Sequence, residues 1–122
     1  MTGVSVYDLP KVGIMSSGDE VVDPFMIEEP KFGQIRDSNR SMLISAIQEA
    51  EPVYCHALTK DYVVDLGIAK DVKEDIEKTI VAALQRVDII ITTGYVHSSL
   101  LTNLLEAYPW VSWILSNLCC RN

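Results

Sequence analysis

The stretch that decides the fold is DVKEDIEKTIVAALQRVDIIITTG, residues 71–94. Its first part places apolar side chains at the three- and four-residue spacing of one helix face, and Asp71 stands where an N-cap is expected. Residues 88–92 are then a nearly unbroken aliphatic run that stops at Thr93-Gly94. Such a run is typical of a parallel strand covered by helices on both faces. The apolar stripe of the predicted helix consists of Val72, Ile76, Ile80, Ala83, Leu84 and Val87.

Two earlier segments have the composition of strands. Residues 11–16 (KVGIMS) are a short apolar run that stops at Ser17-Gly18, and residues 62–68 (YVVDLGI) are rich in β-branched side chains. A short apolar run that ends at a glycine favours a buried strand over a helix. Both segments are therefore predicted to be strands.

Between these strands, residues 39–50 are predicted to form a helix. Asp37 or Ser38 precedes it and can accept hydrogen bonds from the free N–H groups of its first turn. Residues 18–35, before the helix, are rich in proline and acids and predict an irregular loop. The apolar residues at helical spacing are Leu43, Ile47 and Ala50, flanked by Met42 and Ala46.

The order strand, helix, strand, helix, strand predicts an α/β fold. Three layers are expected, α/β/α, with a right-handed parallel sheet in the middle. Ligands of such sheets bind beyond the carboxyl ends of the strands, where Ser17-Gly18 and Thr93-Gly94 lie. The chain has 122 residues and shows no repeat or linker, so we expect one domain.

Composition excludes several classes of function. Lys and Arg number 10 against 17 Asp and Glu, a net charge of -7, which argues against binding to nucleic acid. Three cysteines form neither a disulfide framework nor a zinc motif, and residues 1–20 lack the pattern of an export signal, so a cytoplasmic protein is expected. Residues 98–120 are too polar for a membrane span.

Three motifs, taken together, carry a resemblance to a known family. They are VGIMSSGDEVVDP (residues 12–24), GQIRDSNRSMLISAIQE (residues 33–49) and VDIIITTG (residues 87–94). In this order they resemble the molybdopterin molybdotransferase family, the catalytic domain of bacterial molybdenum-insertion proteins and of the gephyrin E domain. The resemblance implies that family's fold, here in an incomplete version.

The sequence departs from the family pattern in two places. About ten residues, 53–62, look inserted between the first predicted helix and the next strand. After Gly94 the family continues with a glycine-rich turn, whereas this chain has Tyr95. Residues 11–94 are therefore interpreted as a family-like core of a single, partial molybdopterin-binding domain, and residues 95–122 as a divergent tail that covers the sheet.

The resemblance also implies a reaction. Enzymes of this family take adenylylated molybdopterin and molybdate, release the adenylyl group and leave molybdenum on the dithiolene, with Mg²⁺ assisting. The full family architecture implies a homo-oligomer. Glu20 and Asp88 are the predicted catalytic residues, and Asp19, Glu20 and Asp88 the predicted metal ligands. The predicted substrate-binding residues are Ser17, Gly18, Asp37, Ser38, Asn39, Thr93 and Gly94.

Each prediction has an alternative that the sequence leaves open. Asp37 and Ser38 can be ordinary helix caps, Asp88 a solvated turn residue, and Asp19 and Glu20 members of a charged loop. The chain can also be an inactive form of the enzyme, a gephyrin-like scaffold module without catalysis, or a molybdopterin adenylyltransferase. The remaining candidates, read as ordinary residues without a site role, are Cys55, His56, His97, Cys119 and Cys120.

Overall fold

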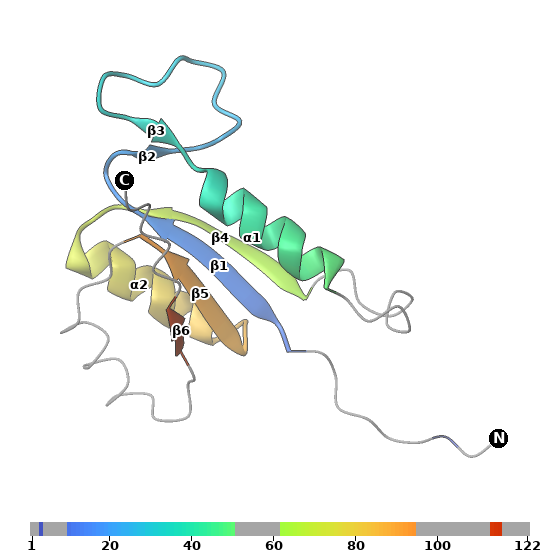
Figure 1. Cartoon of the computed structure of the whole chain (residues 1–122). Helices are drawn as coiled ribbons and strands as arrows, with labels where there is room; N and C mark the ends of the chain where they lie inside the picture. The colour runs from blue at the N-terminus through green and yellow to red at the C-terminus, as the bar shows by residue number, and fades with distance from the viewer. Residues whose placement is uncertain (1–2, 4–9, 51–61, 95–112, 116–122) are drawn as a thin grey trace.

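A computed structural model describes residues 3, 10–50, 62–94 and 113–115 of the chain. Four strands form one sheet in the order β4-β1-β5-β6, and every neighbouring pair in it is parallel. Figure 1 shows β1 and β5 side by side at the centre of this sheet. The predicted parallel sheet is confirmed. The strands are β1 (Val12–Ser17), β4 (Val63–Ala69), β5 (Ile89–Thr93) and β6 (Trp113–Leu115).

Two helices, α1 (Ser38–Glu49) and α2 (Lys73–Leu84), lie on opposite faces of the sheet (Figure 1). Side chains alternate between the faces of a strand. On β4, Val64 and Leu66 pack with the residues of α2, whereas Asp65 between them contacts Arg40 of α1. The three-layer α/β/α architecture expected from the order of elements is therefore present.

The main hydrophobic core lies between α2 and the sheet. Ile80 of α2 is fully buried, and so is Met15 of β1, because the helical stripe covers the sheet face from which Met15 projects. The stripe was predicted correctly from Ile76 onward. The core residues on this side are Met15, Ala69, Ile76, Ile80, Ala83, Leu84, Val87 and Ile90.

The start of α2 differs from the prediction. Its N-cap is Val72, whose side chain makes no capping hydrogen bond and is 45% exposed. Asp71, the predicted cap, stands one residue too early, and its own backbone N–H donates to Asp19 Oδ1 at 3.2 Å. The prediction of Asp71 as cap is wrong because the helix begins one residue later than the apolar stripe does.

The first helix buries less apolar surface than its spacing predicts. Asp37 is the N-cap, as one of the two predicted alternatives has it, and Arg40 is the buried residue of α1. Leu43 and Ile47 are half-buried. The prediction fails for Met42, Ala46 and Ala50, which are exposed because the sheet covers only part of this face of α1.

The segment predicted as an irregular loop contains a short pair of parallel strands, β2 (Val21–Val22) and β3 (Ile35–Arg36). The guanidinium of Arg36 organises the turn between them. Its Nη1 donates to the carbonyl oxygens of Pro24 and Met26 at 3.2 and 2.7 Å, and its Nη2 to that of Glu28 at 3.3 Å. One side chain therefore satisfies three carbonyl groups that a loop leaves without backbone partners.

Several predictions lie outside the described residues. These are the insertion at 53–62 except for Tyr62, the steric effect of Tyr95, and the readings of the two histidines and three cysteines. Of the predicted tail, β6 is described, and its backbone pairs in parallel with β5 at the edge of the sheet. Within the described part of the chain, neither α1 nor α2 is long and apolar enough to cross a membrane.

Candidate functional site

A pocket of about 150 Å³ lies where β1 and β5 end and α1 begins. This is the carboxyl edge of the sheet, the expected place for a ligand. Ser16, Val21, Ile35 and Arg36 line it as well, although none of them was predicted. Seven of the ten predicted site residues line it: Ser17, Glu20, Asp37, Ser38, Asn39, Thr93 and Gly94.

The ends of β1 and β5 approach each other closely in this pocket. Ser16 Oγ and Thr93 Oγ1 are 2.7 Å apart and buried. Gly94 has φ +106, and a Cβ there would lie 2.3 Å from the carbonyl oxygen of Ser17. A residue with a side chain fits neither this conformation nor this space. Glycine at position 94 is therefore required for the two strand ends to form one wall.

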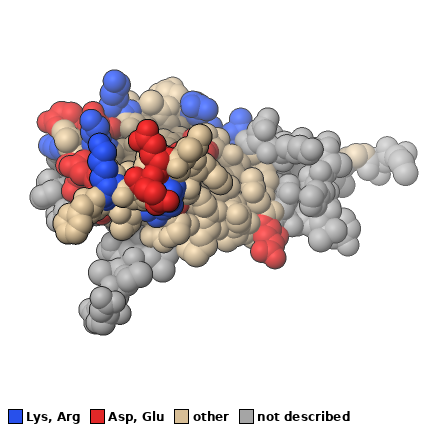
Figure 2. Space-filling view, turned by 90° about the horizontal axis from the view of Figure 1, so that it is seen from above, with Lys and Arg blue, Asp and Glu red and all other residues tan. Residues whose placement is uncertain are grey.

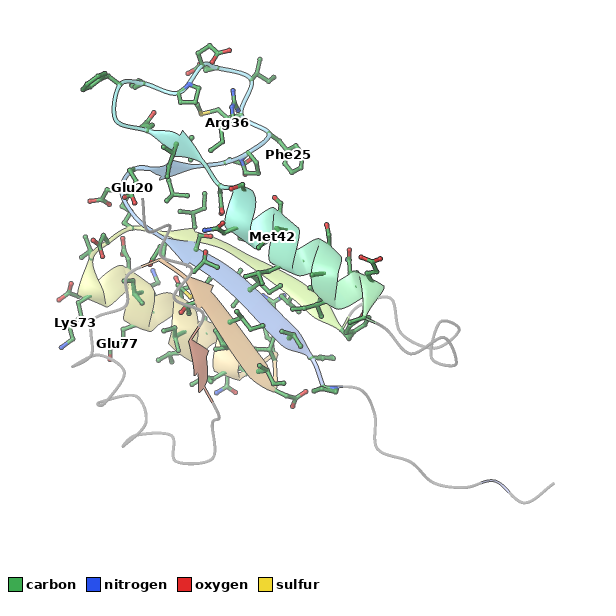
Figure 3. The ribbon with its side chains drawn as sticks, viewed as in Figure 1. Glu20, Phe25, Arg36, Met42, Lys73 and Glu77 are labelled. Atoms are coloured by element: carbon green, nitrogen blue, oxygen red, sulfur yellow. The ribbon has the colours of Figure 1, made fainter. Side chains whose placement is uncertain are left out.

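Gly18 and Glu20 form the turn that follows β1. Gly18 has φ +144, and its backbone N–H donates to the carbonyl oxygen of Ala69 at 3.2 Å. A Cβ at Gly18 would lie 2.7 Å from Glu20 Oε2, so this glycine leaves room for the carboxylate. Glu20 lines the pocket, and Figure 3 shows it beside β2, whereas Glu77 lies on α2.

The N-terminus of α1 forms another wall. The backbone N–H of Asp37 donates to the carbonyl oxygen of Val22 at 2.9 Å, which joins α1 to β2. Asp37 is buried, and its Oδ1 accepts from the backbone N–H of Arg40 at 3.1 Å. Ser38 and Asn39 supply the first backbone N–H groups of the helix, which an α-helix leaves without intrahelical acceptors.

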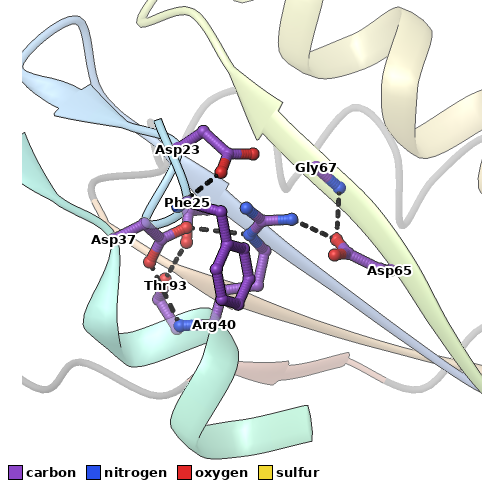
Figure 4. Close-up of polar contacts among 8 residues, drawn as sticks. Asp23, Phe25, Asp37, Arg40, Asp65, Gly67 and Thr93 are labelled. Atoms are coloured by element: carbon purple, nitrogen blue, oxygen red, sulfur yellow. Dashed lines mark hydrogen bonds and ion pairs between the residues drawn. The ribbon is translucent and has the colours of Figure 1, made fainter. Parts of the chain in front are cut away.

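The side chain of Arg40 lies between the carboxylates of Asp37 and Asp65 and contacts both (Figure 4). Its Nε donates to Asp37 Oδ2 at 2.8 Å, and its Nη1 donates to Asp65 Oδ1 on β4. Burial lowers the pKa of Arg40, but the hydrogen bonds that it donates to Asp37 and Asp65, together with their negative charges, outweigh that effect and raise the pKa above its ordinary value. The guanidinium therefore stays charged and offsets part of the negative charge of Asp37 at the pocket wall.

Asp88 does not belong to this site. It precedes β5, at the amino end of the sheet, where its Oδ2 accepts from the backbone N–H of Lys11 at 2.8 Å. Thr93 lies five residues further along the strand, roughly 16 Å away at about 3.3 Å per residue. Asp88 therefore does not converge with Glu20 on one ligand, and that expectation is wrong. The alternative prediction, that Asp88 is a turn residue, agrees with its position before β5.

The predicted metal ligands do not come together either. Asp19 is exposed and bonds to the backbone N–H of Asp71 near the start of α2, outside the pocket lining. Within the described part of the chain, no three His, Cys, Asp or Glu side chains are grouped so that they could hold a metal ion. Glu20 is the predicted ligand in the pocket, and Asp37 uses both carboxylate oxygens on Arg40. These residues do not fit a Mg²⁺ site built from protein ligands.

The surface around the site is mixed in charge. In Figure 2, which views the molecule from above, blue Lys and Arg side chains lie beside red Asp and Glu side chains on the described part of this face. A mixed surface does not create a broad positive field. An anion that enters the pocket is therefore stabilised by the local donors at the strand and helix ends.

Comparison with known proteins shows that the strands and helices around the pocket belong to a region shared with a known family. A family described as "Probable molybdopterin binding domain" matches residues 13–96. The chain is 35% identical over 102 residues to a protein named gephyrin from Dictyostelium discoideum, a match that covers 80% of this chain and 14% of that protein. In the solved structures, a molybdopterin biosynthesis MoeA protein from Pyrococcus horikosii matches with a TM-score of 0.60 and 31% identity, over 80% of this chain and 22% of that one.

Two proteins named molybdopterin molybdenumtransferase are similar as well. The one from Haemophilus influenzae is 35% identical over 92 residues, covering 75% of this chain and 20% of that protein. The one from Nostoc sp. is 33% identical over 117 residues, covering 94% of this chain and 22% of that protein. A match over 94% of the chain extends beyond Gly94, so in this relative the similarity does not stop where the three motifs stop.

The chain thus spans about one fifth or less of the length of these relatives. The family match nevertheless includes the strand ends and the helix N-terminus that form the pocket. The resemblance expected from the three motifs is confirmed, and with it the link to molybdenum cofactor biosynthesis at the level of the family. The chain belongs to the family of probable molybdopterin binding domains.

Proposed function

We propose that the pocket binds the anionic end of adenylylated molybdopterin, and that the chain provides substrate binding for a molybdotransferase-type insertion of molybdate. Family membership and the two relatives named molybdopterin molybdenumtransferase support this proposal. The observation that carries it is the meeting of hydroxyl-bearing residues at the strand ends and the first-turn residues Ser38 and Asn39 of α1 in one small pocket at the carboxyl edge of the sheet.

These donors suit a phosphate group. The N–H groups of Ser38 and Asn39 lie at the positive end of the α1 dipole, where anions are stabilised. The hydroxyls of Thr93 and Ser16 belong to the same pocket wall and are hydrogen-bonded to each other, which leaves one of their two protons for a ligand. Asp37 would repel an anion if it were an isolated carboxylate, but its ion pair with Arg40, which Arg40 shares with Asp65, offsets part of that repulsion.

The size of the pocket limits what it encloses. Pockets that hold a whole cofactor typically measure about 300–1,000 Å³, and this one measures about 150 Å³. Only part of the substrate fits inside, so the phosphate end enters and the ring system lies against the outer surface. Glu20, in the turn after β1, lines the pocket, and we propose it as the carboxylate that exchanges a proton with the bound group.

Other expectations remain predictions. From membership of the family we also propose the involvement of Mg²⁺, a homo-oligomeric assembly, a cytoplasmic location and molybdenum insertion itself. Within the described part of the chain no three acidic side chains form a cation site, so Mg²⁺ at this pocket would depend on the substrate phosphate and water for further ligands.

A binding experiment tests the proposal. Adenylylated molybdopterin is titrated into the 122-residue chain by isothermal calorimetry, with AMP as a probe of the phosphate contact. Thr93→Val removes one hydroxyl at nearly constant volume and is expected to weaken binding by about 2–10-fold. Thr79→Val is the matched control, because the hydroxyl of Thr79 donates to the carbonyl oxygen of Asp75 on α2. Absence of binding by the unsubstituted chain, or equal affinity of both variants, would contradict the proposed function.

A further inference from the structure

We propose that Arg40 and Asp65 are positioning residues for the pocket: they fix the Asp37 carboxylate, and through it the first turn of α1 that receives the ligand. This inference rests on the proposed function for its effect on binding. Neither Arg40 nor Asp65 lines the pocket, so both act through Asp37.

The connection begins with an irregularity in the edge strand β4. Ile14 of β1 pairs with Asp65, and the next residue of β1, Met15, pairs with Gly67, so Leu66 is an extra residue. Such a bulge redirects the neighbouring side chains, and bulges are frequent beside functional sites. Gly67 adopts φ +79, and its backbone N–H donates to Asp65 Oδ1 at 2.8 Å. The bulge therefore sets the direction of the Asp65 carboxylate.

Asp65 in turn orients Arg40. The guanidinium is planar, so carboxylates on two of its nitrogens determine its plane. Nε contacts Asp37 and Nη1 contacts Asp65, from two different elements of the fold. The side chain of Arg40 is 7% exposed and that of Asp37 is 2% exposed, whereas that of Asp65 is 52% exposed. The half-exposed carboxylate of Asp65 therefore contacts the buried Arg40–Asp37 pair from the solvent side.

Asp37 has no rotational freedom left in this arrangement. Oδ1 accepts from the backbone N–H of Arg40, and Oδ2 accepts from its Nε. A helix cap requires only the first of these bonds. The second bond and its extension to Asp65 go beyond capping, and an ion pair with a half-exposed partner adds little to folding stability. These two bonds compensate the burial of the guanidinium, and together they hold the Asp37 carboxylate in one orientation at the pocket wall.

The first arm of the test is a double-mutant cycle on ligand affinity. Asp65→Asn is expected to weaken binding of adenylylated molybdopterin by about 3–10-fold. Arg40→Lys is expected to weaken it by a similar factor, because an ammonium group cannot replace the planar guanidinium that contacts both carboxylates. In the Asp37→Asn background, Asp65→Asn is expected to cause no further loss, because its effect passes through Asp37. Asp71→Asn, an exposed acid at the start of α2, is the control and should leave affinity unchanged. Additive losses, or full affinity of Asp65→Asn, would overturn the proposal.

The second arm needs no ligand. Hydrogen exchange of the Arg40 backbone N–H reports whether Asp37 stays in its capping position. Asp65→Asn is expected to accelerate this exchange by about 5–10-fold, while the amide of Ile80 in the core of α2 exchanges at its original rate. Unchanged exchange at Arg40 would refute the positioning role. Faster exchange at Arg40 in a chain that binds no adenylylated molybdopterin would instead refute the proposed function and leave the positioning of Asp37 in place.

Discussion

At Gly94, a single backbone conformation determines the shape of the pocket wall. Gly94→Ala places a methyl group against the carbonyl oxygen of Ser17 in a backbone region that side chains disfavour. We expect the free energy of unfolding to fall by more than about 2 kcal/mol, since a left-handed conformation alone costs about 1–2 kcal/mol. Urea unfolding measures this change, and the same variant should lose affinity for AMP.

Gly33 provides the matched control for this substitution. It also has a positive φ, +85, but a Cβ there would meet no atom within 4 Å. Gly33→Ala should therefore cost only the conformational part, about 1–2 kcal/mol. Equal losses at Gly33 and Gly94 would show that the close approach of the strand ends has no energetic consequence.

Ile80 tests the core between α2 and the sheet. Its side chain is fully buried, so Ile80→Ala should lower the free energy of unfolding by about 2–5 kcal/mol. Met42, also apolar but 50% exposed on α1, is the comparison, and Met42→Ala should change stability by less than about 0.5 kcal/mol. Urea denaturation curves of both variants measure these changes in the free energy of unfolding. A small change for Ile80→Ala would contradict the packing of α2 against the sheet.

Most residues of the pocket could be predicted from local motifs, because strand ends and helix caps have recognisable sequences. Asp88 could also have been placed correctly, since a residue that precedes a parallel strand lies at the amino edge of the sheet. Arg40 follows the capping motif directly, and its position in the first turn is a signal that the sequence offers. Its second partner, Asp65, is 25 residues away and follows from the fold alone.

At the scale of elements, α2 offers a direct test of its N-cap. Val72 has the extended backbone of an N-cap, φ -117 and ψ 128, but no side-chain acceptor. Val72→Ser supplies one and should raise the free energy of unfolding by about 0.5–2 kcal/mol. Val72→Ala removes the same apolar surface without adding an acceptor, so it should give no gain. If both variants were stabilised equally, the gain would come from removing the exposed valine side chain and not from the added capping acceptor.

The elements themselves were predictable to within a few residues, and the reasons for the differences are physical. Each predicted strand begins one residue before the observed one, because a run of apolar or β-branched residues indicates a strand but does not fix the residue at which it begins. The pair β2 and β3 was missed because its two partners are separated by the loop that Arg36 organises. The exposed side of α1 was missed because periodicity does not report how much of a helix the sheet covers.

At the scale of the whole molecule, the last prediction separates binding from turnover. We expect the 122-residue chain to bind adenylylated molybdopterin but to insert molybdenum at least about 100-fold more slowly than the Haemophilus influenzae relative under equal conditions, since loss of one stabilising group commonly costs that factor. Of the two predicted catalytic residues, Glu20 lines the pocket, whereas Asp88 lies at the opposite edge of the sheet. One of the two predicted catalytic groups is therefore missing from the pocket.

Reconstitution of a molybdenum-free molybdoenzyme measures insertion, and calorimetry on the same preparation measures binding. Glu20→Gln, compared with Glu77→Gln on α2, then locates any residual activity. If the rate of this chain falls with Glu20→Gln alone, the pocket is the reacting centre. A rate equal to that of the relative would contradict the prediction. It would mean that the residues around this pocket suffice for the chemistry, although the chain spans only 20% of the Haemophilus protein.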